Sequence, residues 1–131
     1  MPLLSEGGPF AKLRITPAGP FCQVVETFTL RLAVKDGWIV RYMSRDRATH
    51  SVIRTTSQLD VRDVTSQIAK LKSAKVPVVL VGEMPLDGEL IELTVYGENG
   101  TLSVAWWTIV PHGAEAIGDF VDWLRRAVRK H

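Results

Sequence analysis

The chain has 131 residues, of which 46% are hydrophobic and 23% are charged, with a formal net charge of +2. This composition is typical of globular proteins, because disordered chains are poor in apolar residues and rich in uncompensated charge. The length suits a single domain over residues 1–131 that folds without disulfides or structural metals. No apolar run approaches the roughly 18 residues of a membrane span, so we expect no membrane association.

Charge is distributed unevenly along the chain. Residues 1–75 carry 12 Lys and Arg against 6 Asp and Glu, a balance of +6. Residues 76–131 carry 4 against 8, a balance of −4. This asymmetry indicates either a basic and an acidic face or two halves of one fold whose charges attract.

The single cysteine and the first residues suggest a compartment. Cys22 cannot form an internal disulfide, which favours a reducing environment. The first residues lack a basic segment followed by an apolar stretch, so we expect no secretory signal and a cytoplasmic location.

The first 20 residues contain four prolines and three glycines. Proline at this density argues against a helix or a central strand. We therefore predict that residues 1–20 form an N-terminal arm, in which residues 10–16 alternate weakly as a short edge strand.

A β-hairpin is predicted next. Residues 27–34 alternate with period two, and Asp36-Gly37 is a strong hairpin-turn signal before the apolar run 38–43. A two-residue turn would place Arg31 opposite Tyr42, in position for a cation–π contact.

A third strand and a first helix follow. A polar turn over residues 44–49 leads to a strand over residues 50–56. Residues 60–73 then carry one helical stripe, with Asp60 as the N-cap. The members of the stripe are Val61, Val64, Ile68 and Leu71.

The second half repeats this plan. Strands are predicted over residues 78–84, 90–97 and 102–110, with turns at Asp87-Gly88 and Asn99-Gly100. An amphipathic helix over residues 114–129 closes the chain. The predicted fold is α+β, a mostly antiparallel meander of about six strands with two helices on one face, in the order βββα-βββα.

The turns define the two faces of the second-half strands. With Asn99-Gly100 as the loop, Val95 lies opposite Val104 and Leu93 opposite Trp106. The core face is then Leu80, Met84, Ile91, Leu93, Val95, Val104 and Trp106. The other face is Val79, Val81, Glu83, Glu92, Thr94, Tyr96, Ala105 and Trp107.

This second face is half apolar and carries two aromatic residues, so it needs a cover. The cover is the N-terminal arm, a second subunit or an outside partner. Tryptophan and tyrosine supply much of the binding energy in interfaces. We predict a binding patch that consists of Val79, Val81, Tyr96 and Trp107.

No motif indicates a cofactor, a phosphate loop or a catalytic nucleophile. Cys22 lies in an apolar, strand-like context, which favours a buried inert thiol over a nucleophile assisted by His50 or His112. The three histidines are scattered, so no metal site is predicted.

Two charged groups remain as candidates. A basic stretch with one aromatic is either a solvated hairpin or a nucleic-acid patch. Its members are Arg41, Tyr42, Arg45, Arg47 and Arg54. Glu83 and Glu92 lie opposite each other in the predicted register, as splayed exposed side chains or as a pair with a shared cation, a raised pKa or an arginine partner.

Residues 86–125 carry an Asp87-Gly88 turn, the Trp106-Trp107 pair, Pro111 and a closing amphipathic helix with Phe120 and Trp123. This pattern resembles that of many small uncharacterised bacterial proteins, some of which are similar to immunity or antitoxin-like binders. The resemblance implies a protein that acts by binding a partner, without catalytic residues.

We therefore predict a non-enzymatic protein-binding module of immunity-like or accessory type, without a cofactor, whose partner is another protein or a second copy of the chain. The alternative is a nucleic-acid-binding protein that uses the basic hairpin over residues 41–54. A small enzyme that uses Glu83 and Glu92 for proton transfer is disfavoured.

Overall fold

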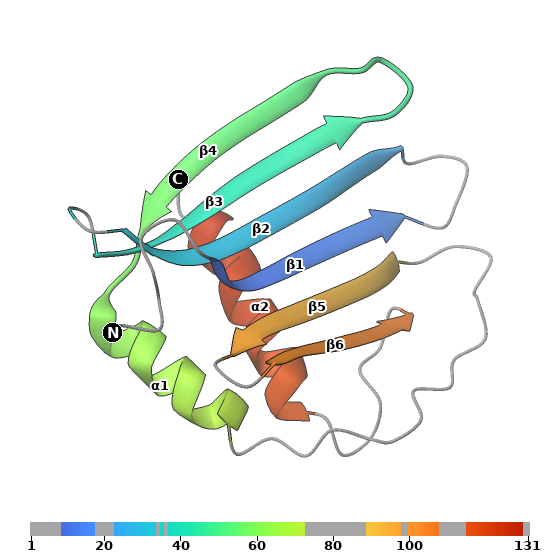
Figure 1. The fold of residues 1–131 in the computed structure, drawn as a ribbon. Helices are drawn as coiled ribbons and strands as arrows, with labels where there is room; N and C mark the ends of the chain where they lie inside the picture. Colours follow the sequence, from blue (N-terminus) through green and yellow to red (C-terminus); the bar gives the residue numbers. More distant parts are fainter. Residues whose placement is uncertain are drawn as a thin grey trace.

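The computed structural model describes residues 9–17, 23–33, 35, 37–72, 89–97, 100–107 and 115–129. The described residues form an α+β fold, as the sequence predicts (Figure 1). The strands are β1 (Pro9–Pro17), β2 (Val24–Ala33), β3 (Gly37–Asp46), β4 (Val52–Gln58), β5 (Glu89–Gly97) and β6 (Gly100–Trp107), and the helices are α1 (Val61–Lys72) and α2 (Glu115–Arg129).

All six strands belong to one antiparallel sheet in the order β4-β3-β2-β1-β5-β6. Strand β1 lies inside this sheet between β2 and β5, so the prediction of an edge strand was wrong. Its two prolines stand at its ends, where a missing backbone donor does not interrupt the ladder. The five residues 11–15 are proline-free and pair on both sides.

The β2–β3 hairpin has a longer loop than predicted. Ala33 pairs with Gly37, so residues 34–36 separate the strands, and Gly37 has a φ of 70°. The register differs from the predicted one by an odd number of residues, which exchanges the faces of β3. Arg31 therefore lies opposite Ile39 on one face, and Tyr42 lies opposite Phe28 on the other. The predicted Arg31–Tyr42 contact is wrong.

The β5–β6 hairpin is shifted by two residues from its predicted register. Leu93 lies opposite Val104 and Ile91 opposite Trp106, because Gly97 pairs with Gly100. An even shift keeps each side chain on its expected face. Trp106 is therefore buried in the core and Trp107 lies on the other face, as the alternation predicts.

Helix α1 begins at a local hydrogen bond. The Arg62 backbone N–H donates to Asp60 Oδ1 at 2.7 Å, which confirms Asp60 as the N-cap. Val64 is fully buried, whereas Val61 is 61% exposed, so its place in the predicted stripe was wrong.

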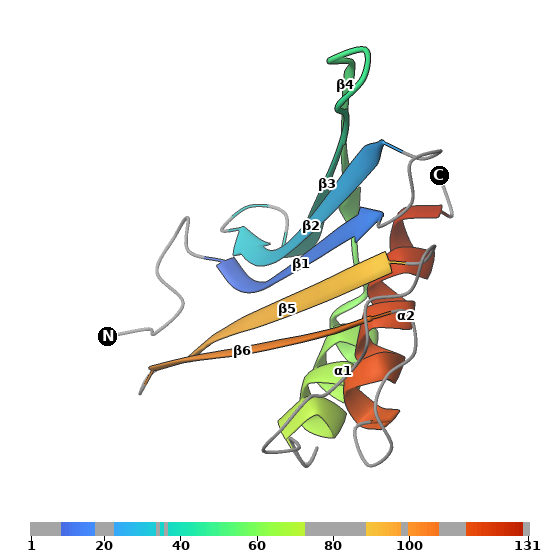
Figure 2. The same ribbon diagram turned by 90° about the vertical axis from the view of Figure 1, so that its right-hand side faces the viewer.

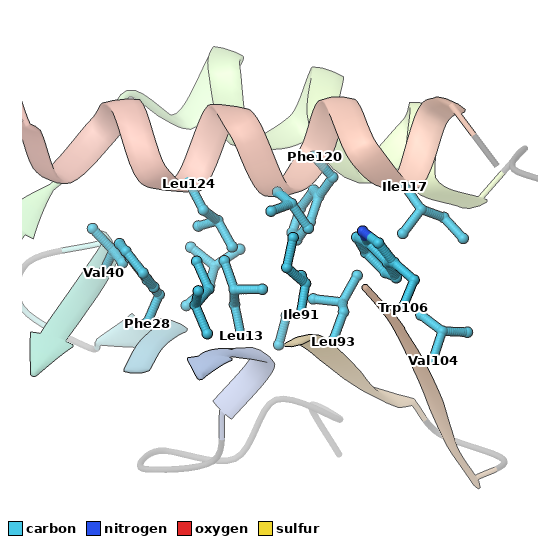
Figure 3. Close-up of a cluster of buried hydrophobic side chains, with 14 residues drawn as sticks. Leu13, Phe28, Val40, Ile91, Leu93, Val104, Trp106, Ile117, Phe120 and Leu124 are labelled. Atoms are coloured by element: carbon cyan, nitrogen blue, oxygen red, sulfur yellow. The ribbon is translucent and has the colours of Figure 1, made fainter. Parts of the chain in front are cut away.

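Both helices lie on the same side of the sheet (Figure 2). Ile117, Phe120 and Leu124 of α2 point towards the buried side chains of the sheet (Figure 3). Arg125 Nη1 lies 3.3 Å from Glu89 Oε1 and ties α2 to β5. No helix in the described part of the chain is long and apolar enough to cross a membrane.

Several predicted features lie outside the described residues. They are the strand over residues 78–84, the Asp87-Gly88 turn, and the residues Cys22, Val79, Leu80, Val81, Glu83, Met84 and His112.

The two adjacent tryptophans give a test of this architecture. We expect Trp106→Ala to lower the free energy of unfolding by about 3–5 kcal/mol, because it empties a core site that is 6% exposed. Trp107→Ala, at a half-buried position on the other face, is expected to lower the free energy of unfolding by clearly less than Trp106→Ala does. Urea unfolding followed by circular dichroism measures both, and equal losses would contradict the one-sided core.

A basic trough on the open face of the sheet

The face of the sheet that points away from both helices is called the open face below. Alternation and register assign its side chains, and no described element packs over it (Figure 2). Its central members are Lys12, Arg14, Val25, Thr27, Thr29, Arg41, Met43, Arg45, Arg54, Thr56, Glu92 and Thr94.

Two adjoining hollows lie on the open face, with volumes of about 660 and 460 Å³. They share Lys12, Thr27 and Met43, so together they form one continuous depression, which we call the trough. Its floor is strand β2, whose side chains here are short and half-buried: Val25, Thr27 and Thr29.

Long cationic side chains stand on both sides of this floor. Lys12 and Arg14 of β1 form one wall, and the other wall comes from β3 and β4. Its members are Arg41, Arg45 and Arg54. Because β1 and β3 are the two neighbours of β2, the walls stand roughly 10 Å apart.

The strand register aligns these residues in rows across the sheet. One row runs Arg14, Thr27, Met43 and Arg54, and the next runs Lys12, Thr29, Arg41 and Thr56. Each row therefore places a cation on either side of a threonine of the floor.

The β3–β4 turn adds two basic groups at one end of the trough, Arg47 and His50. Asp46 Oδ1 accepts hydrogen bonds from the backbone N–H groups of Ala48 at 2.9 Å and Thr49 at 3.2 Å. The His50 N–H donates to the Asp46 carbonyl at 2.7 Å, and His50 has a left-handed φ of 64°. These bonds fix the turn.

The cations of the trough are exposed and have no carboxylate partner among the residues that the structure describes. Arg125 and Glu89 form a salt bridge on the opposite side of the sheet. None of the six cations that line the trough forms one in that part of the chain. These six are Lys12, Arg14, Arg41, Arg45, Arg47 and Arg54.

Glu92 is the acidic residue among those that line the trough. It stands on β5 directly opposite Arg14 of β1, with Ala105 of β6 on its other side. The expected carboxylate neighbour, Glu83, lies outside the described residues. Arg14 is the arginine that stands across from Glu92 in the register, but the two side chains form no salt bridge.

The basic stretch predicted from the sequence is only partly brought together. Arg41, Arg45, Arg47 and Arg54 all line the trough. Tyr42 also borders the smaller hollow, but its ring lies on the helix-covered face, where its hydroxyl donates to Glu26 Oε2 at 2.6 Å. Its ring packs edge-on against Phe28 with centroids 5.0 Å apart, so it is no stacking platform beside these arginines.

The predicted aromatic patch is divided. Tyr96 lies opposite Thr101 at one end of the β5–β6 hairpin, and Trp107 lies opposite Leu90 at the other. Six residues of β5 separate the two ends, or about 20 Å. The hydroxyls of Thr94 and Ser103, 3.3 Å apart, lie between them. Both aromatics do lie on the open face, as expected from alternation.

Sequence reasoning missed Lys12 and Arg14 as part of a site. Their alternation with Ala11, Leu13 and Ile15 is visible in the sequence. This alternation was discounted because the prolines favoured an arm. An arm would not place Lys12 and Arg14 beside β2 and β5.

No protein-family model matches the chain, and no curated protein is significantly similar to it. The resemblance of residues 86–125 to small bacterial proteins therefore stays a prediction. Within the described residues, no group of three or more His, Cys, Asp or Glu is placed to hold a metal ion.

The position of Tyr42 gives a second test. We expect Tyr42→Phe to lower the free energy of unfolding by about 1–2 kcal/mol, because it removes a hydrogen bond to a carboxylate. It is not expected to alter binding to any polyanion. Thermal melts and a salt-dependent oligonucleotide titration measure the two effects, and weakened binding at unchanged stability would place Tyr42 in the site after all.

Proposed function

We propose that the protein is a binding module that acts on a partner protein through the open face of its sheet, without catalysis. The observation that carries this proposal is the trough, a hollow lined by exposed cations on the face that neither helix covers. The sequence supports the proposal further, because no motif of a catalytic centre was found in it. An immunity-like or accessory role is the version that the resemblance implies.

The construction of the face supports this proposal. The floor consists of β2 side chains anchored in a paired strand, with β1 and β3 on either side. A rigid sheet holds its side chains in fixed positions, so little ordering entropy is lost when a partner binds. The half-buried Trp107 and Tyr96 at the margin are side chains of the kind that contribute strongly to interfaces.

Filling the floor of the trough tests the proposal. We expect Thr29→Trp to weaken partner binding at least about tenfold, because an indole placed between the walls blocks the floor without changing charge. The matched control is Thr65→Trp, at an exposed position on α1. The wild type and each variant serve as bait in a lysate of the source organism, and the captured proteins are identified by mass spectrometry. The partner is then purified and titrated with the wild type and with each variant.

The proposal fails if Thr29→Trp, still folded, binds the purified partner as tightly as the wild type and the control do. It also fails if no protein is enriched over an unrelated bait.

Self-association is the second candidate function, favoured by the position of Trp107 at the rim of the open face beside Leu90. A two-fold dimer would use this rim twice. We then expect sedimentation velocity to show a wild-type dimer and a folded Trp107→Glu monomer. The matched control is Leu102→Glu, on the helix side of the same strand, which should stay dimeric. A monomeric wild type would exclude this candidate.

A further inference from the structure

We infer that the trough binds an extended acidic segment of the partner, which lies along β2 with its carboxylates between the two cationic walls. This inference rests on the proposed function and deepens it, because it names the chemistry of the surface that the open face recognises.

Charge complementarity is the first argument. Six cations line the trough against Glu92 alone among the lining residues. They lie on several strands, yet the strand register gathers them on one face. Like charges held this close repel one another, and an anionic partner relieves that repulsion.

The spacing of the walls matches an extended polypeptide. Lys12 and Arg14 are two residues apart on one strand, or about 6.7 Å, and a second extended chain repeats its side chains at the same interval. Carboxylates at alternate positions of such a segment therefore have the same spacing as Lys12 and Arg14, so that each can face one of these cations. The walls lie roughly 10 Å apart, which is about two spacings between neighbouring strands and leaves room for one extended chain between them.

The side chains of the trough favour carboxylates on a polypeptide over a nucleic-acid strand. Single-stranded nucleic acids gain affinity by stacking bases on aromatic rings. The floor offers valine, threonine and methionine instead, and Tyr42 faces the helices. Five of the six cations are arginines, whose planar fork matches a carboxylate in bidentate geometry.

A defined peptide provides the test. The probe is a fluorescein-labelled (Glu-Thr)6 peptide, titrated by fluorescence anisotropy with the full chain at low and at moderate salt. We expect saturable binding that weakens as salt rises, because exposed charges are screened. The double variant Arg14→Glu/Arg45→Glu is expected to bind at least about tenfold more weakly, since two attractions become repulsions.

A matched control separates the trough from net charge. Arg62→Glu/Arg126→Glu makes the same change in charge at two exposed positions on the helices. We expect its affinity to stay within about twofold of the wild type at moderate salt, because its charges lie beyond a screening length from the trough. Glu92→Gln is expected to bind the peptide several-fold more tightly, because it removes the opposing carboxylate.

Three results would overturn the inference. The first is an unchanged peptide affinity in Arg14→Glu/Arg45→Glu, and the second is an equal loss of peptide affinity in this variant and in the control Arg62→Glu/Arg126→Glu. The third is an affinity for the oligonucleotide dT12 at least as high as the affinity for the peptide. Circular dichroism confirms that each variant is folded. If the peptide fails while Thr29→Trp still abolishes binding of the natural partner, the acidic segment is wrong and the proposed function stands.

Discussion

The pairing of β1 on both of its sides is the constraint on which the rest of the structure depends. This strand joins the β1–β4 meander to the β5–β6 hairpin and places Arg14 between Thr27 and Glu92. Its alternation then divides the molecule. Ala11, Leu13 and Ile15 are almost completely buried beneath the helices, and Lys12 and Arg14 point to the opposite face. The same nine residues thus build the core and one wall of the trough.

The two helices lie on one side because both are amphipathic and must bury their apolar stripes against the sheet or each other. Phe120, Val121 and Leu124 of α2 supply the centre of this contact. The other side of the sheet keeps threonines and long cations, which remain stable in water without a cover. An open antiparallel sheet with one apolar and one polar face accounts for the stability of the chain, and its polar face is the surface through which we propose that the protein binds.

Local periodicity in the sequence predicted both helices, the amphipathic character of α2, and the opposite faces of Trp106 and Trp107. Periodicity did not predict the order of the strands or the register of the β2–β3 hairpin, which depend on contacts between distant segments and on loop length. Nothing in residues 10–17 shows that β1 lies between β2 and β5, since sheet order is set by contacts between distant segments. The β2–β3 loop is one residue longer than the Asp36-Gly37 signal suggests, and that difference alone moves Tyr42 to the core side. The trough depends on both features, so the sequence showed only the cations of its β3–β4 wall.

The most direct test of the central claim is to map where the acidic peptide contacts the protein, by following the ¹H–¹⁵N shifts of backbone amides during titration. The account predicts that the largest changes fall on Thr27 and Thr29 and on their neighbours in β1 and β3, with the outer surfaces of α1 and α2 unchanged. Shifts that concentrate on the helices, or that spread evenly over every exposed cation including Arg62 and Arg126, would contradict it.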